Sequence, residues 1–103
     1  MATAYITHPD CCRHEMGSYH PESPERLRAI QSWLEEHELT NRLISIQAKP
    51  ATSQQLERIH PAHYVAHLRA SQPMEGLHSV DPDTSICPHS IRAAELAAGA
   101  VIQ

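Results

Sequence analysis

Apolar residues follow two different patterns in the first half of the chain. Residues 4–7 (AYIT) form a short apolar run, and residues 43–46 (LISI) form another in which Ser45 is the one polar residue. Continuous apolarity is typical of a strand that is covered on both faces, as in a parallel sheet. Between these runs, residues 24–38 carry apolar side chains at helical spacing, at Leu27, Ile30 and Leu34. The pattern predicts a right-handed strand–helix–strand unit.

Cap residues mark where the predicted helices begin. Ser23 is a suitable N-cap for the first helix, and Pro24 suits its first helical position. Thr52 and Gln55 are spaced as a capping box, which predicts a second, short helix. Pro61 ends that helix, because proline cannot donate the backbone hydrogen bond that a helix interior needs.

The second half of the chain predicts two more helices and a loop. Residues 62–70 (AHYVAHLRA) predict a helix with Val65 and Leu68 facing inward. Residues 71–89 contain prolines and a glycine, which predicts a long loop. Ser90 is expected to cap a final alanine-rich helix, whose small side chains allow another element to approach closely.

The predicted elements do not make a closed domain by themselves. Two short parallel strands with about four helices leave a sheet incomplete, since parallel strands normally lie inside larger sheets with helices on both faces. We therefore expect an α/β fold in which residues 1–103 form a single partial domain.

Composition narrows the classes of partner. The chain has 103 residues, 41% of them hydrophobic and 4% aromatic, with no Phe. A formal charge of −4 without a basic run argues against nucleic acid and against anionic membranes. No apolar stretch is long enough to span a membrane, the first ten residues lack signal-peptide character, and three cysteines fit a reducing compartment. We therefore expect a cytoplasmic protein.

A histidine- and cysteine-containing loop before the first helix allows several interpretations. Cys11, Cys12, His14 and His20 are ligand types that suit structural zinc. Adjacent cysteines fit one tetrahedral ion poorly, and a further ligand would have to come from a distant residue such as His78 or Cys87. Alternatively, a cysteine beside histidine acts as a nucleophile, or the thiols are buried as small apolar groups. The spacing favours the last interpretation.

Two other groups of polar residues have plain structural explanations. His63 and His67 lie four apart on a predicted helix, as zinc ligands often do, but Tyr64 stands where a metalloprotease needs glutamate. A solvated helix face explains the pair better. Asp81 and Asp83 flank a proline, which is typical of a turn, although a rigid turn also presents a carboxylate to a ligand.

Three segments together resemble the N-terminal portion of the histone deacetylase superfamily. They are HPDCCRHEMGSYHPESPERLRAI (8–30), IHPAHYVAHL (59–68) and DPDTSICPHSIRAAELAAGA (81–100). The similarity is greatest to bacterial class II-like deacetylases and acetylpolyamine amidohydrolases. The resemblance implies an arginase/deacetylase-like parallel-sheet fold. It also implies a zinc hydrolase that acts on acetyl-lysine or acetylpolyamine-type amides.

The resemblance also implies roles for individual residues. Asp83 matches a rim carboxylate that binds the substrate, and His20 and Pro21 match the loop that lines the tunnel to the active site. Arg26 matches an arginine near the acetate exit, where a guanidinium suits carboxylate binding. Some relatives hold a structural zinc with this first loop, and its ligands here would be His20 and a cysteine of the Cys11–Cys12 pair.

The residues that would hold the catalytic zinc are missing from the matched segments. The family's His-His pair and Asp-x-His ligands lie beyond them, and the sequence contains neither. We therefore expect the N-terminal third of such an enzyme, which binds no catalytic zinc and is inactive alone. The alternatives are a non-catalytic ligand- or partner-binding module and a histidine-rich metal buffer. The exposed sheet edge or a helix would favour a homo-oligomer, with domain swapping as one form.

Overall fold

A pair of parallel strands lies at the base of the fold. The computed structural model describes residues 2–103, and in it β1 (Ala4–Thr7) pairs with β2 (Ile44–Gln47), with Ile6 opposite Ile46. The parallel pairing confirms the prediction, with β2 shifted by one residue. The shift arises because Leu43 closes a 3₁₀ turn, η2 (Thr40–Arg42), by donating its N–H to Thr40 O.

The strands are less covered than the apolar runs predict. Three of the four residues in β2 are exposed, including Ile44 at 52%. Within residues 2–103, neither β1 nor β2 pairs with a further strand. The expectation of a strand covered on both faces is therefore wrong for the described residues, since a continuous apolar run only signals that a strand is suited to burial.

Helix α1 (Pro24–Glu36) connects the two strands and is tied to β1. Its N-cap is Ser23 and its first residue is proline, as predicted, although the Ser23 side chain makes no capping hydrogen bond. The Tyr5 hydroxyl donates to Gln31 Oε1 at 2.9 Å, which links strand to helix.

The end of α1 is a Schellman turn. Leu39 N–H donates to Leu34 O and Glu38 N–H donates to Glu35 O. Glu38 takes the left-handed position with φ of 56°. Glycine usually fills this position because a Cβ atom is unfavourable there. The two backbone hydrogen bonds therefore hold Glu38 in a conformation that a residue with a side chain disfavours.

The second pair of helices begins where the sequence predicts, but the first of the two ends at Leu56, before the predicted stop at Pro61. Helix α2 (Ser53–Leu56) begins with the predicted capping box, in which Thr52 and Gln55 hydrogen bond reciprocally. Helix α3 (Ala62–Ser71) buries Val65, as expected. His63 and His67 are both exposed, consistent with a solvated face.

Two segments that the sequence predicts as loops contain regular structure. The predicted long loop holds a hairpin of β3 (His78–Asp81) and antiparallel β4 (Thr84–Ile86), with an irregular register. The loop after β1 contains a 3₁₀ helix, η1 (Pro9–Arg13). The loop predictions rested on the prolines in both segments. In the structure, prolines lie at the start of η1 and in the hairpin turn, where no backbone N–H donor is needed.

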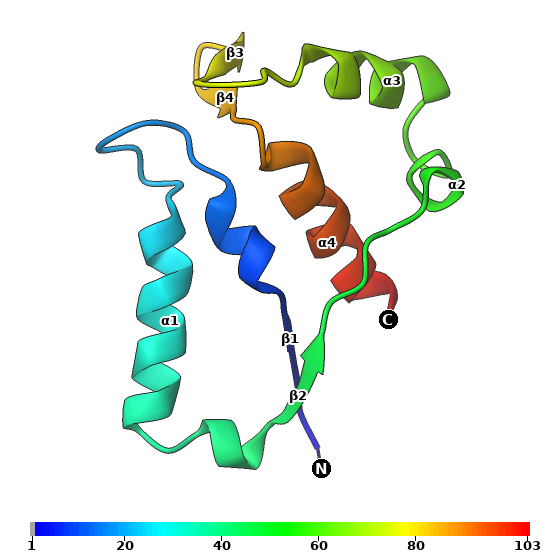
Figure 1. Ribbon diagram of the computed structural model, residues 1–103. Helices are drawn as coiled ribbons and strands as arrows, with labels where there is room; N and C mark the ends of the chain where they lie inside the picture. Colours follow the sequence, from blue (N-terminus) through cyan, green and yellow to red (C-terminus); the bar gives the residue numbers. More distant parts are fainter. Residues whose placement is uncertain (1) are drawn as a thin grey trace.

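Helix α4 (Ser90–Ile102) organises the core. Figure 1 shows it beside β1 and η1, with α1 on one side and α2 and α3 on the other. Leu96 is completely buried, and the other buried apolar residues are Ala48, Ala51, Val65, Ile86 and Cys87. The N-cap of α4 is His89 rather than the predicted Ser90, because Ser90 already has helical geometry and its hydroxyl bonds elsewhere.

The small residues of α4 permit a very close approach, as predicted. A Cβ atom on Gly99 would lie 1.7 Å from Lys49 O, so the carbonyl occupies the space that a side chain would take. Nearby, Ala51 N–H donates to Glu95 O at 2.9 Å. The segment after β2 is therefore packed directly on the backbone of α4.

This packing predicts that Gly99→Ala destabilises the fold. Alanine normally stabilises a helix by about 1 kcal/mol relative to glycine, but here the added methyl overlaps Lys49 O and should cost about 1–3 kcal/mol. Urea unfolding followed by circular dichroism measures the change. At exposed Ala97 of the same helix, the ordinary preference of a helix for alanine over glycine should hold, so Ala97→Gly should also destabilise the fold. A Gly99→Ala variant as stable as the wild type would contradict the close packing.

Candidate functional site

The structure brings His20 and Asp83 together although they lie 63 positions apart. His20 Nε2 lies 3.3 Å from Asp83 Oδ1. The backbone N–H of Glu22 donates to His20 Nδ1 at 3.0 Å, so Nδ1 is unprotonated and Nε2 carries the proton that Asp83 accepts. The Asp83 side chain is 95% exposed, whereas that of His20 is 24% exposed. A half-sheltered histidine thus orients an open carboxylate.

The turn of the β3–β4 hairpin holds Asp83 in place. The N–H of Asp83 donates to Asp81 Oδ1 at 2.9 Å, and Ser79 Oγ donates to Asp81 O at 2.9 Å. This is the turn chemistry that an Asp-Pro-Asp sequence favours. The structural interpretation as a turn is therefore confirmed, and the Asp83 carboxylate is open to solvent.

Pro21 and Arg26 have different surroundings. Pro21 is exposed directly after His20. Arg26, in the first turns of α1, forms a half-exposed ion pair with Glu22, Nη2 to Oε1 at 3.7 Å. Within residues 2–103 no hydrogen bond or ion pair joins Arg26 to His20 or Asp83. The structure brings His20 and Asp83 into contact, and Pro21 directly follows His20 in the chain. Arg26, which is expected near the acetate exit, lies apart from this pair.

A hollow of about 670 Å³ lies beside His20, between the loop before α1 and the start of α4. Polar and apolar residues both line it, among them Cys12, Arg13, Tyr19, His20, Arg28 and His89. Tyr19 is fully exposed and has a φ of 68°, a conformation that is unfavourable for a tyrosine. The site is thus a wide surface depression with an aromatic ring at its edge.

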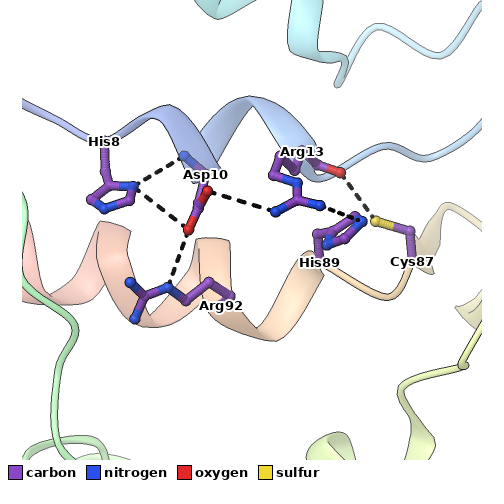
Figure 2. A network of polar contacts seen from close by, with 6 residues as sticks. All are labelled: His8, Asp10, Arg13, Cys87, His89 and Arg92. Atoms are coloured by element: carbon purple, nitrogen blue, oxygen red, sulfur yellow. Dashed lines mark hydrogen bonds and ion pairs between the residues drawn. The ribbon is translucent and has the colours of Figure 1, made fainter.

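A network of polar contacts joins η1 to α4 (Figure 2). Asp10 is its centre: Arg92 Nε donates to Asp10 Oδ2 at 3.4 Å, and Arg13 Nη1 lies 3.9 Å from Oδ1. The backbone N–H of Asp10 donates to His8 Nδ1 at 3.0 Å. These contacts fix η1 along the first turns of α4.

A second group of contacts joins the end of η1 to the residues before α4. Arg13 Nη2 lies 3.4 Å from His89 Nε2, and Cys87 Sγ donates to Arg13 O at 3.3 Å, as Figure 2 shows. His14 Nδ1 lies 2.6 Å from Ser90 Oγ. Sequence reasoning did not find these pairs. The only local signal was the spacing of Asp10 and Arg13, which places both on one side of a helical turn.

The side chains proposed for structural zinc do not gather into one group. His14 contacts Ser90, whereas His20 contacts Asp83. Burial raises the pKa of the Cys11 thiol above its ordinary value, and the nearby Cys12 and Asp10 raise it further. A zinc ligand must be a thiolate, so this environment opposes ligation.

No zinc site fits the described residues. Among residues 2–103, there is no group of three or more His, Cys, Asp or Glu side chains that could hold a metal ion. Neither the structural zinc considered for the first loop nor the catalytic zinc therefore has a ligand group among residues 2–103.

Comparison with known proteins identifies the family. Residues 20–103 match the model of the Histone deacetylase domain. This chain belongs to the histone deacetylase family. The match begins at His20 and contains Pro21, Arg26 and Asp83, so the family assignment rests on the region that carries the candidate site.

Individual relatives agree with this assignment. The chain is 41% identical over 83 residues to a histone deacetylase-like amidohydrolase of Pseudomonas aeruginosa, which covers 81% of the chain and 22% of the relative. It is 30% identical over 112 residues to the polyamine deacetylase HDAC10 of Mus musculus, which covers 100% of the chain and 17% of the relative. The chain therefore spans about a fifth of the length of these relatives.

A solved structure confirms the predicted fold class. The crystal structure of the HDA15 HD domain superposes with a TM-score of 0.83 at 28% identity, over 96% of this chain and 29% of that one. The chain is thus part of a mixed α/β deacetylase-family domain. No helix among residues 2–103 is long and apolar enough to cross a membrane.

The Cys11 environment predicts a pH dependence of stability. Because its pKa is raised in the folded state, the stabilisation by the neutral thiol is complete below about pH 8 and is lost as pH rises through the raised pKa. The difference in unfolding free energy between wild type and Cys11→Ala should therefore shrink as pH rises above about 8 and through the raised pKa of Cys11. Urea titrations at several pH values measure it. A difference that stays constant over this range would contradict the effect of burial.

Proposed function

We propose that residues 1–103 form a single partial domain, the N-terminal third of a zinc-dependent hydrolase domain that cleaves acetyl-lysine or acetylpolyamine-type amides. In this proposal the chain contributes the substrate-binding residues His20, Pro21 and Asp83, and it lacks the zinc site. The contact between His20 and Asp83 is the observation that carries the proposal. It unites, across 63 positions, two residues to which the family resemblance gives the same role.

The geometry of Asp83 suits recognition of an acylated amine. A carboxylate has acceptor sites on both oxygens, and the contact with His20 uses only Oδ1. The neighbouring hollow of about 670 Å³ lies in the size range of small-molecule sites. Asp83 does not line this hollow, but His20, which contacts Asp83, does. In this proposal Oδ2 of Asp83 accepts an N–H group or an ammonium of the substrate, and the rest of the molecule extends past His20 into the hollow.

Arg26 is proposed to serve the acetate product rather than the amine. Its guanidinium is only loosely paired with Glu22 at 3.7 Å, with both groups about half exposed. An exposed pair of this kind contributes little, so the guanidinium keeps donors for a carboxylate. Zinc, when bound in a complete domain of this family, supplies the polarisation of the amide carbonyl, and residues 2–103 offer no site for it.

The test is a binding titration with N-acetylputrescine, which carries both an acetamide and an ammonium. Weak binding should shift the ¹⁵N-amide NMR signals of residues around His20 and Asp83, and Asp83→Asn should weaken binding about threefold, the scale of an exposed charge contact. The same preparation with added zinc should release no acetate.

Glu36→Gln is the matched control for this titration. It removes the same charge from an exposed position at the far end of α1, so it should leave the affinity unchanged. Equal weakening by both variants would show that only net charge matters, and zinc-dependent release of acetate would overturn the proposed inactivity of the chain alone.

We also propose that a second copy of the chain is a partner, through helix α1. This helix has no buried residue, and Ile30 and Trp33 are exposed at 43% and 53%. An exposed apolar stripe of this kind marks an interaction surface. A second copy offers the same stripe, which satisfies the self-complementarity of a two-fold interface.

Light scattering coupled to gel filtration tests this assembly. The wild type should shift from monomer to dimer as concentration rises, and Trp33→Glu should abolish the shift because it places a charge within the stripe. Ser32→Glu adds the same charge at the neighbouring exposed position and should leave the dimer intact. A wild-type chain that remains monomeric at millimolar concentration would exclude the interface.

A further inference from the structure

Ser90 is the centre of a buried hydrogen-bond cluster that the proposed function does not use. Its side chain belongs to a residue only 6% exposed, and its Oγ accepts the N–H of Cys87 at 2.8 Å. The same oxygen lies 2.6 Å from His14 Nδ1 and 3.4 Å from Cys87 Sγ. We call the pair of His14 and Ser90 the clasp.

The tautomer of His14 sets the direction of the clasp. A serine hydroxyl has one proton to donate and two acceptor sites. With Cys87 N–H occupying one acceptor site, Ser90 Oγ can accept from His14 Nδ1–H and donate its proton to Cys87 Sγ, and in the other tautomer it donates that proton to Nδ1. The bond is short and sheltered, which is the environment in which hydrogen bonds are strongest.

The clasp lies between the two segments that carry the candidate site. His14 precedes His20 by six positions on the loop, and Ser90 follows Asp83 by seven positions after the hairpin. The clasp and the His20–Asp83 contact therefore close a small ring between two chain segments. Fixing one side of a short ring limits the separation of the other side and lowers the entropic cost of the second contact.

The loop between His14 and His20 has no regular structure of its own to hold His20. Gly17 and Tyr19 both have positive φ, of 99° and 68°, and this stretch belongs to no helix or strand. Its position must therefore come from contacts with other segments, which include Leu77 beside Gly17 and the contacts at its two ends. On the other segment, Cys87 reinforces the clasp by donating to Arg13 O at 3.3 Å.

We infer that His14 and Ser90 are positioning residues, whose hydrogen bond holds the loop against the hairpin so that His20 meets Asp83. The inference rests on the proposed function for the role of the His20–Asp83 pair. The hydrogen bond between His14 and Ser90 does not depend on that function. It assigns a task to Ser90 beyond helix initiation, and to His14 beyond the metal ligation considered from the sequence.

The experiment reads the His20 ring in the full chain without substrate. Long-range ¹H–¹⁵N NMR spectra report which ring nitrogen carries the proton, and Asp83→Ala supplies the reference for an unpaired His20. In Ser90→Ala and His14→Ala, the His20 signals should move toward that reference, as expected for about a fivefold loss of the paired population when one hydrogen bond is removed. Ser90→Thr keeps the hydroxyl and should retain the wild-type signals.

Two features of the design separate positioning from simple stability. In His14→Ala, Ser90 keeps its bond from Cys87 N–H and has Cys87 Sγ as an acceptor, so the start of α4 remains satisfied and the variant should fold. Ser71→Ala is the matched control, since the Ser71 hydroxyl donates to His67 O within α3, away from the site. It should leave the His20 signals unchanged.

Wild-type His20 signals in folded His14→Ala would overturn the inference, whatever the melting temperature. This readout is independent of substrate. If Asp83→Asn leaves the affinity for N-acetylputrescine unchanged, the proposed function fails, while a response of His20 to the clasp variants still supports the positioning role.

Discussion

The close packing of α4 on the chain segment after β2 is the constraint on which the rest of the structure depends. Leu96 is fully buried, and Gly99 leaves room for Lys49 O where any other residue would place its Cβ atom. Two elements far apart in sequence are thereby fixed at backbone distance. Because the same helix also contacts β1 and η1, its position determines where the N-terminal elements lie.

The first turn of α4 positions the segments that carry the candidate site. Residues just before and at its start contact the end of η1 through Cys87, His89 and Ser90, and Arg92 in the same turn contacts Asp10. The loop that carries His20 and the hairpin that carries Asp83 both extend from this junction. The site is therefore an outcome of helix placement, even though the residues that contact one another there lie on irregular segments.

The histidines and cysteines of the first loop illustrate how composition can mislead. Metal ligands must converge on one point, with thiols deprotonated. Here His14 and His20 point to different partners, and burial raises the pKa of the Cys11 thiol. The same residue types that suggest a metal centre serve instead as hydrogen-bond donors and acceptors between segments that have little apolar area to hold them together.

The sequence by itself determined the parallel strands, α1, the capping box of α2, the inward face of α3, and the small residues of α4. These depend on periodicity and on neighbours within a few positions. It also carried the motifs that place His20 and Asp83 in the histone deacetylase family. Only the tertiary structure decided the β3–β4 hairpin, the N-cap at His89, the contact of Asp10 with Arg92 and the clasp of His14 with Ser90. The last two pairs join residues 82 and 76 positions apart. No local pattern encodes such contacts, because they form only once the packing of α4 has brought the two ends of the chain together.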